Sequence, residues 1–202
     1  MIELKNVSKM FDTKTIFSDV SFVINDGEFV VISGKSGCGK STLLSLISGI
    51  ERVTSGSITV DGTDLTKTRN KTKYLREKIS FLFQNFALSD NKTVMKNLKL
   101  IPKNARSSIS IEQALDILGI ADKAYKPVYT LSGGEQQRVA LARVMLKKCD
   151  IVLADEPTGS LDIENSGIVI EVLKKLNRAG KTIILVTHDE SLKNIGNRLI
   201  QL

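Results

Sequence analysis

Short runs of apolar residues divide the chain into a series of predicted β-strands. Residues 2–5 and 16–24 are two such runs, and the second ends at the turn-forming sequence Asn-Asp-Gly. Residues 29–32 are continuously apolar, as expected for a strand that is buried on both faces of a sheet. Further strands are predicted at residues 58–60, 79–83, 151–154, 182–186 and 198–202.

Helical patterns alternate with these strands. Leu43, Leu44 and Ile47 lie on one face of a predicted helix. Gly49 is placed to end it. A second helix is predicted at residues 163–177. Because strands and helices alternate along the chain, we expect an α/β fold with a mainly parallel sheet.

Residues 86–130 differ from the rest, since they carry helical patterns and few strand signals. The apolar positions Ile111, Ala114, Leu115 and Leu118 recur at helical spacing. We interpret this part as a small helical insert within the α/β core. The expected organisation is a single domain over residues 1–202, with a helical subdomain at about 86–148.

Composition and charge narrow the possible partners. The 202 residues are 42% hydrophobic and 25% charged, which is ordinary for a globular domain. A net charge of +7 favours an anionic partner, and nucleotide, nucleic acid and lipid all remain open. Cys38 and Cys149 lie far apart, so neither a disulfide framework nor a zinc site is expected, and a reducing cytosol fits.

Neither a signal peptide nor a membrane span is expected. The first residues lack an apolar core, and no stretch approaches the roughly 18 apolar residues that a span requires. If this protein serves a membrane, it must dock on a partner that crosses it.

A glycine-rich loop between the strand at 29–32 and the following helix has the pattern G-x-x-x-x-G-K-[ST]. Its members are Gly34, Lys35, Ser36, Gly37, Cys38, Gly39, Lys40 and Ser41, and Thr42 follows directly. The glycines let successive backbone N–H groups face phosphate oxygens, and the helix start adds its positive dipole. Lys40 would bind the β- and γ-phosphates, and the Ser41 hydroxyl would bind Mg²⁺.

The alternative interpretation of this loop is a glycine-rich turn with a stray lysine. It is disfavoured because the loop lies between a buried strand and a helix, as a phosphate-binding loop requires. Cys38 is best interpreted as a small residue tolerated in the loop, and a reactive thiol there is the second possibility.

Two acids follow the strand at 151–154. Acids at the carboxyl end of a parallel strand emerge where ligands bind in open α/β sheets. Asp155 would then hold Mg²⁺, and Glu156 would act as the general base that polarises the attacking water. A solvated turn is the alternative, and the phosphate loop upstream makes it the weaker one.

Residues 131–138, Leu-Ser-Gly-Gly-Glu-Gln-Gln-Arg, resemble the signature sequence of ABC ATPases. The departure from LSGGQ is Glu135, a common variant in that family. Other family motifs follow the same resemblance. Gln84 resembles the Q-loop glutamine, residues 160–162 the D-loop, His188 the switch histidine and Phe11 the aromatic residue that stacks on adenine.

Each of these residues also has an ordinary alternative. Gln84 could be a polar turn residue, His188 a structural histidine and Phe11 a packed hydrophobe. The position of His188 after the apolar strand at 182–186 favours the functional role.

The resemblance implies a P-loop NTPase core with an N-terminal antiparallel β subdomain and a small helical insert. It implies that two such domains pair head to tail and hold ATP and Mg²⁺ between them. Ser132, Gly133, Gly134, Glu135 and Asp162 of one copy would contact the nucleotide of the other. Gln84 would join Ser41 and Asp155 at the metal, and Glu156, His188, Gln84 and Lys40 would form the catalytic set.

Residues 155–162, DEPTGSLD, resemble the group of macrolide exporters, lipoprotein-release systems and bacteriocin or antimicrobial-peptide export systems. Residues 81–88 resemble the same group, whereas amino-acid importers more often have DEPTSALD. The compact chain, for which no C-terminal regulatory domain is expected, resembles the ATPases of bacteriocin exporters. The expected protein is therefore an ATPase at the cytoplasmic face of the plasma membrane, peripheral to it through a separate permease subunit.

Two alternative functions differ in how well the sequence supports them. An ABC ATPase that acts on nucleic acid usually has two cassettes or a long coiled-coil insert, and the segment between Gln84 and Ser132 is too short for one, so no nucleic-acid partner is expected. An ATPase that regulates cell-wall hydrolases in division would have the same motifs. The basic stretches at 67–78 and 92–106 are best interpreted as solvated surface, and contact with anionic lipid headgroups is the alternative.

Overall fold

The computed structural model describes residues 1–67, 71–159 and 161–202, with the backbone alone at residues 71 and 72. Its centre is a five-stranded parallel sheet with the strand order β6-β7-β8-β3-β9. The strands are β3 (Phe29–Ser33), β6 (Ile79–Leu82), β7 (Ile151–Asp155), β8 (Thr182–Thr187) and β9 (Arg198–Gln201). Every residue of β3 and β8 is buried, as the continuous apolar runs predicted.

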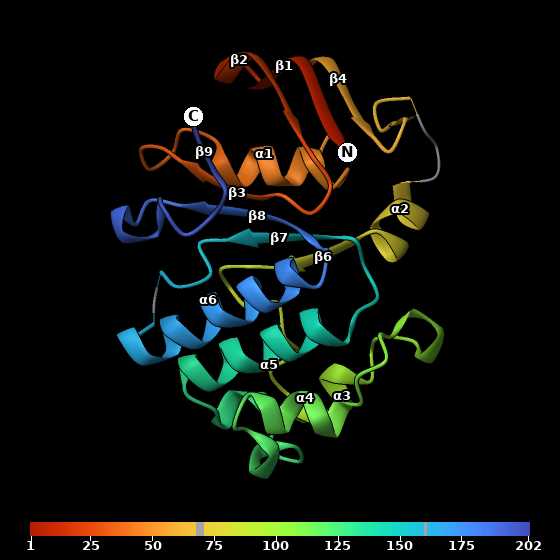
Figure 1. Ribbon diagram of the computed structural model, residues 1–202, viewed down its shortest axis with the longest axis vertical. Helices are drawn as coiled ribbons and strands as arrows, with labels where there is room; N and C mark the ends of the chain where they lie inside the picture. The colour runs from red at the N-terminus through yellow and green to blue at the C-terminus, as the bar shows by residue number, and fades with distance from the viewer. Residues whose placement is uncertain (68–70, 160) are drawn as a thin grey trace.

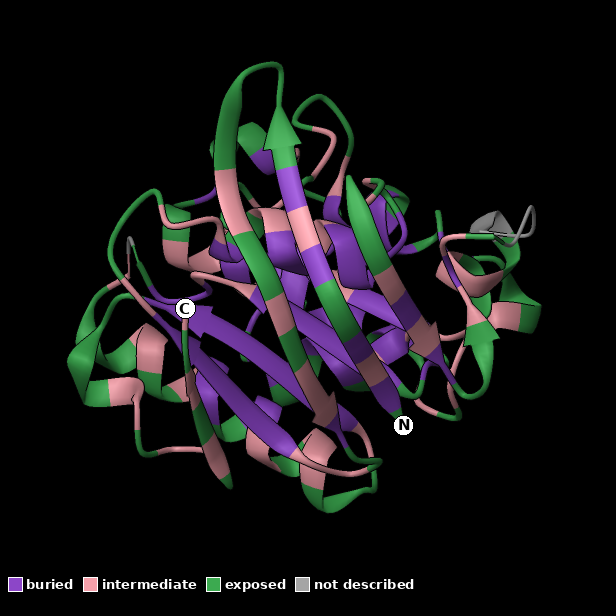
Figure 2. Cartoon of the chain, turned by 90° about the horizontal axis from the view of Figure 1, so that it is seen from above, coloured by how far each residue is buried: buried purple, intermediate pink, exposed green. Residues whose placement is uncertain are grey.

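A second sheet of four antiparallel strands lies above the first (Figure 1), in the order β2-β1-β4-β5. Its strands are β1 (Ile2–Phe11), β2 (Lys14–Ile24), β4 (Ser55–Val60) and β5 (Thr63–Asp64). Seen from above, β1 carries a mixture of buried, intermediate and exposed positions, while β3 and β8 below it are entirely buried and the edge strand β9 is not (Figure 2). The predicted antiparallel subdomain is thus confirmed.

The first strand is longer than the sequence pattern predicted. It continues past residue 5 to Phe11, because bulges between Leu4 and Met10 let it stay paired with β2 through polar residues. Asn6 at one bulge has a φ of 46°.

Helices fill the spaces on both sides of the parallel sheet (Figure 1). Helix α1 (Lys40–Ile47) lies between the two sheets and buries Leu43, Leu44, Leu46 and Ile47. Ser48 is its C-cap, and Gly49 follows with a φ of 76°, so the predicted stop is confirmed. Helices α5 (Gly133–Leu146) and α6 (Ile163–Arg178) cover the other face.

The helical insert lies on the far side of α5 and includes α3 (Val94–Leu98) and α4 (Ile111–Ile117). Within it, the buried amide of Asn97 accepts a hydrogen bond from the Ser89 N–H (2.8 Å) and donates one to the Ser89 carbonyl (3.1 Å). Short 3-10 turns occupy Lys103–Ala105, Ala121–Lys123, Val128–Thr130 and Glu190–Leu192. Helix α2 (Lys71–Glu77), before β6, was not predicted.

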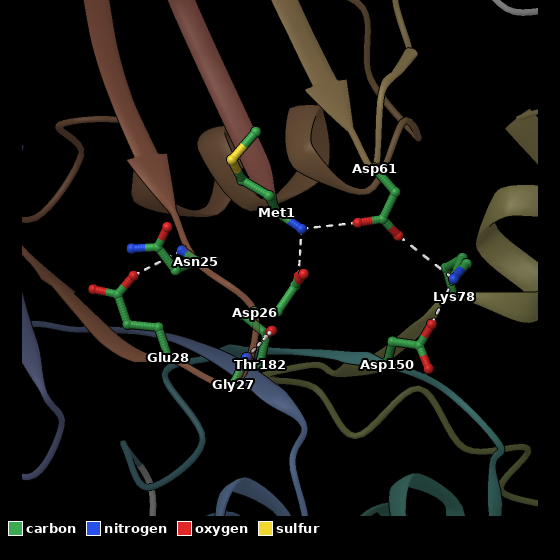
Figure 3. A network of polar contacts seen from close by, with 9 residues as sticks. All are labelled: Met1, Asn25, Asp26, Gly27, Glu28, Asp61, Lys78, Asp150 and Thr182. Carbon is green, nitrogen blue, oxygen red and sulfur yellow. Dashed lines mark hydrogen bonds and ion pairs between the residues drawn. The ribbon is translucent and has the colours of Figure 1, made fainter.

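A network of ion pairs joins the two sheets at the edge where the parallel strands begin (Figure 3). The Lys78 ammonium lies 2.6 Å from Asp150 and 3.5 Å from Asp61, and the hydrogen bond to Asp150 is the main reason that the pKa of Lys78 is raised. Asp61 also accepts a hydrogen bond from the amino group of Met1 (2.8 Å), which in turn pairs with Asp26. The network lies at the edge opposite to the one where the parallel strands end.

Across the described ranges, no helix has the length and apolar character needed to cross a bilayer.

Gly56 and Gly62 provide a matched test of the β1–β4 pairing. Both have positive φ angles, 83° and 77°, but a Cβ on Gly56 would collide with the backbone of Lys5 and Asn6, while one on Gly62 meets only open space. In each alanine variant the left-handed backbone should lower the free energy of unfolding by about 1–2 kcal/mol. In Gly56→Ala the collision should lower it by about 1–3 kcal/mol more. Urea unfolding measures both, and equal losses would contradict the pairing.

Candidate nucleotide site

The register of the parallel strands brings three polar segments to one edge of the sheet. Ser33 of β3 lies opposite Thr187 of β8, and Asp155 of β7 lies opposite Val186. The phosphate loop, the two acids and His188 therefore leave the sheet side by side. In open α/β sheets this edge, at the carboxyl ends of the strands, is where ligands bind.

The phosphate loop depends on glycine at its last turn. Gly39, the N-cap of α1, has a φ of 99°, and a Cβ there would collide with Ile16 and Phe17 of β2. The loop can therefore curl tightly beneath the β1–β2 hairpin only with glycine at this position. Lys40 is 6% exposed, and its ammonium donates hydrogen bonds to the carbonyls of Gly34 (2.9 Å) and Lys35 (3.1 Å).

Ser41 and Asp155 form a pair of oxygen ligands beside the loop. The Ser41 hydroxyl donates to Oδ1 of Asp155 at 2.9 Å. Burial is the main reason that the pKa of Asp155 is raised, and the charge of Glu156 adds to this, whereas Ser41 and Lys40 act in the opposite direction. A half-buried carboxylate next to a hydroxyl is a donor set that suits a small divalent cation such as Mg²⁺. These residues fit the metal that the sequence implied.

Glu156 is held in an unusual backbone conformation. Its φ of 44° lies in the left-handed region, which is strained for a residue with a side chain. One carboxylate oxygen accepts hydrogen bonds from the Thr187 hydroxyl (3.2 Å) and the His188 N–H (3.3 Å), and the other lies 2.8 Å from His188 Nδ1. The carboxylate and the imidazole are thus fixed as a unit at the end of β8.

A surface pocket gathers most of these groups, although Lys35 and Asp155 are not among its lining residues. Its lining comprises Ile16, Ser36, Gly37, Gly39, Lys40, Ser41, Thr42, Gln84, Glu156 and His188. Gln84 reaches it from the exposed turn after β6. Apart from Ile16, every residue in the lining was named from the sequence. Gly34 and the half-buried Cys38 are outside the lining and lie close together, since a Cβ on Gly34 would meet the Leu202 carbonyl oxygen and the Cys38 sulfur.

The start of α5 is a second, separate site of polar groups. Ser132 is the N-cap, and its hydroxyl accepts from the Glu135 N–H (3.3 Å), while the Glu135 carboxylate accepts from the Ser132 N–H (2.8 Å). This capping box holds the pKa of Glu135 below its usual value, chiefly through the hydrogen bond from the Ser132 backbone. Glu135 also lies 3.4 Å from the Lys123 ammonium.

The starts of α5 and α6 are packed together. A Cβ on Gly134 would collide with the Asn165 side chain, so glycine permits this approach. Asp162 is the N-cap of α6 and accepts from the Asn165 backbone N–H (2.7 Å), and Arg138 of α5 donates to the side-chain amide oxygen Oδ1 of Asn165. Of the predicted D-loop, Ser160 lies outside the described residues.

Thr187 and Gln137 were missed by the sequence analysis. Thr187 is fully buried and holds Glu156. Gln137 is 1% exposed and donates from its side-chain amide to the carbonyl of Pro157, directly after Glu156. A polar residue ending an apolar strand could have indicated Thr187, but the contact of Gln137 is visible only in the fold.

The structure therefore divides the predicted residues into two groups. Gln84, Glu156, His188 and most of the phosphate loop share one pocket, whereas Ser132, Gly133, Gly134, Glu135 and Asp162 are not part of its lining. Phe11, also outside the lining, ends β1 on the hairpin whose other strand supplies Ile16. One copy of the chain presents a phosphate loop and, apart from it, a second helix start suited to an anion.

Comparison with known proteins agrees with this arrangement. The family described as "ABC transporter" matches residues 17–159. The phosphonates import ATP-binding protein PhnC of Lactobacillus delbrueckii subsp. bulgaricus is 41% identical, over 99% of this chain and 85% of its own length. The glutamine transport ATP-binding protein GlnQ of Bacillus subtilis is 39% identical, over 99% of this chain and 86% of its own length.

The macrolide export ATP-binding/permease protein MacB of Campylobacter jejuni is 39% identical over the whole chain, which spans 33% of the length of that relative. A solved structure of the ABC cassette MJ0796, described as a dimer in a post-hydrolysis state bound to ADP and Pi, superposes with a TM-score of 0.87. It is 36% identical and covers 100% of this chain and 94% of its own. A further dimeric structure of MJ0796 also has a TM-score of 0.87, at 38% identity.

The fold and the pocket define a P-loop ATPase domain, and the predicted fold class is confirmed. The chain belongs to the ABC transporter family. It is an ATP-binding, ATP-hydrolysing subunit of that family, as the resemblance in the sequence indicated.

The capping box at α5 generates a prediction about pH. Because the pKa of Glu135 is lowered, its stabilising effect is complete above the ordinary carboxyl pKa and is lost as the pH falls through the lowered one. At pH 7, Glu135→Ala should reduce the free energy of unfolding by about 0.3–1 kcal/mol. Glu135→Gln, which can still accept from Ser132, should lose less. Urea unfolding at pH 7 and below pH 4 checks this. A difference in the free energy of unfolding between Glu135→Ala and the wild type that persists unchanged in acid would contradict the assignment.

Proposed function

We propose that this chain works as a head-to-tail homodimer that hydrolyses ATP with Mg²⁺ and drives a separate membrane permease. In this proposal residues 1–202 act as a single ABC ATPase domain with its helical subdomain at about 86–148. The dimer is located at the cytoplasmic face of the plasma membrane and is peripheral to it through the permease. The observation that carries the proposal is the separation of the phosphate-loop pocket from the α5 start within one chain.

Nucleotide binding is assigned to the loop and its neighbours. The N–H groups of residues 34–42 cradle the phosphates, and Lys40 leaves its loop carbonyls to pair with the β- and γ-phosphates. Ser41, Asp155 and Gln84 would hold Mg²⁺, which neutralises charge on the phosphates when bound. Phe11, 44% exposed at the end of β1, stacks on the adenine ring.

Hydrolysis is assigned to Glu156 and His188. Glu156 accepts the proton of a water whose oxygen bonds to the γ-phosphorus, while the bond from that phosphorus to the β–γ bridging oxygen breaks. The products are ADP and inorganic phosphate. His188 holds the γ-phosphate and, through Nδ1, the orientation of Glu156. The rigid support from Thr187 suits a base that must be aimed at one water.

The second copy completes the site. The N–H groups at the start of its α5, at Ser132, Gly133 and Gly134, would approach the γ-phosphate together with Glu135 and Asp162. The dimeric state of the MJ0796 structures supports this pairing.

A groove between β6 and the helical insert is the proposed seat of the permease. Apolar and basic side chains share its walls, and Arg143 donates from the groove to the carbonyls of Phe86 and Ala87, in the turn that contains Gln84. A permease segment bound in this groove would thus contact Arg143, which holds the turn that brings Gln84 to the nucleotide pocket. The lining comprises Arg76, Ser80, Phe81, Phe83, Leu100, Ile101, Pro102, Ala105, Arg143 and Lys147.

For the transported substrate we propose a peptide, bacteriocin or antimicrobial that is exported. The resemblance of residues 81–88 and 155–162 to export ATPases supports this, as does the similarity to MacB, whose name describes macrolide export. Amino-acid import is the second candidate, because GlnQ is equally similar. Regulation of cell-wall hydrolases in division is a third, and no nucleic-acid partner is proposed.

Glu156→Gln tests the function. It should lower hydrolysis at least about 100-fold, because the amide cannot accept the proton of water. It should keep ATP binding, so an ATP-bound dimer should accumulate in size-exclusion chromatography. The control is the double variant Lys40→Ala/Glu156→Gln, which should remain monomeric with ATP. Wild-type turnover in Glu156→Gln, or a dimer that forms equally in the control, would refute the site assignment.

A further inference from the structure

Lys9 is a buried cation in the antiparallel sheet, and nothing in the proposed chemistry uses it. Its side chain lies on β1 and the residue is 7% exposed. The ammonium is satisfied from the segment after α1, donating to the Glu51 carboxylate (3.0 Å) and to the Arg52 carbonyl (2.9 Å). Burial of a lysine is unfavourable unless it is paired in this way, so the head group of Lys9 has a fixed position.

The third contact of Lys9 is the Phe11 ring. The Lys9 ammonium lies 4.3 Å from the ring centroid, within the range of a cation–π interaction. Lys9 and Phe11 are two residues apart on the same strand, which places both side chains on one face of the sheet. A phenylalanine at a strand end has no polar atom that could fix its ring, and Phe11 is 44% exposed.

The β1–β2 hairpin joins Phe11 to the strand that supplies Ile16 to the nucleotide pocket. Met10 pairs with Thr15 and Phe11 with Lys14, and the next residue of β2, Ile16, lines the pocket and packs over Gly39 of the phosphate loop. The Lys9 head group covers one face of the Phe11 ring. Phe11 is 44% exposed, so the other face of its ring remains for a planar ligand, and the proposed adenine contact would use it.

We propose that Lys9 is a positioning residue for the adenine base: it holds the Phe11 ring in the orientation that accepts the base. The inference rests on the proposed adenine contact of Phe11. Glu51 and the Arg52 carbonyl fix the ammonium, the ammonium fixes the ring, and the base stacks on a ring that is already ordered. Ordering the ring before binding removes part of the entropic cost of binding.

The test compares a ligand that has a base with one that lacks it. Lys9→Met should weaken binding of MgADP about two- to fivefold and leave binding of magnesium pyrophosphate unchanged, as measured by calorimetry. Lys9→Arg should retain MgADP affinity, because a guanidinium also packs on an aromatic face. The matched control is Lys5→Met, which removes an exposed lysine from the same strand, paired only with Glu3 at 3.1 Å among its described partners, and should change neither affinity.

Equal weakening of both ligands by Lys9→Met, or weakening of neither, would overturn the inference, whatever the thermal stability of the variant. Phe11→Ala separates this result from the proposed function. If Phe11→Ala weakens MgADP and Lys9→Met has no further effect in that background, the two residues act together. If Phe11→Ala weakens MgADP but Lys9→Met alone does not, the adenine contact stands and the role of Lys9 is wrong. If Phe11→Ala leaves MgADP binding intact, the adenine contact itself is wrong.

Discussion

The in-register pairing of β7, β8 and β3 is the constraint on which the nucleotide site depends. All three strands are parallel, and β3 and β8 are buried along their whole length. They end together, so Asp155, Thr187 and the loop after Ser33 leave the sheet at one edge. A shift of the β7–β8 pairing by one residue would separate the Glu156 carboxylate from the Thr187 hydroxyl and the His188 ring, which are 3.2 and 2.8 Å away. A shift of the β3–β8 pairing would move the phosphate loop away from both. The packing of the core thus fixes the distances between the side chains of the nucleotide site.

Helix α5, against which α3 and α4 of the helical insert pack, is linked by polar contacts to the segments that follow β7. Gln137 donates to the carbonyl after Glu156, and Arg138 donates to Asn165 at the start of α6. The helix that carries the signature residues is therefore tied to the segment that carries the proposed base. A force on the insert, where we place the permease, has a direct route to the turn that holds Glu156. In return, that turn holds the α5 start in place for a second copy of the chain.

The features that could be predicted from the sequence are those set by residue type and spacing within short segments. The glycine-rich loop, the buried strands and the end of α1 near Gly49 follow from residue type and spacing, and the structure confirms them. Helix α2 was missed because its segment is rich in basic residues and lacks an apolar stripe. Gln137 and Lys9 were missed for a different reason. The bond from Gln137 spans 20 residues and that from Lys9 to Glu51 spans 42, and no local pattern reveals such contacts.

The central claim is that the site is complete only when the loop of one copy meets the α5 start of another. Mixing two inactive variants tests it most directly. Lys40→Ala removes the lysine of the loop, and Ser132→Arg blocks the close approach of the glycine-lined helix start. A mixed dimer rebuilds one intact site, so ATPase activity should return in part when the two proteins are combined. Full activity of Ser132→Arg on its own would contradict the account.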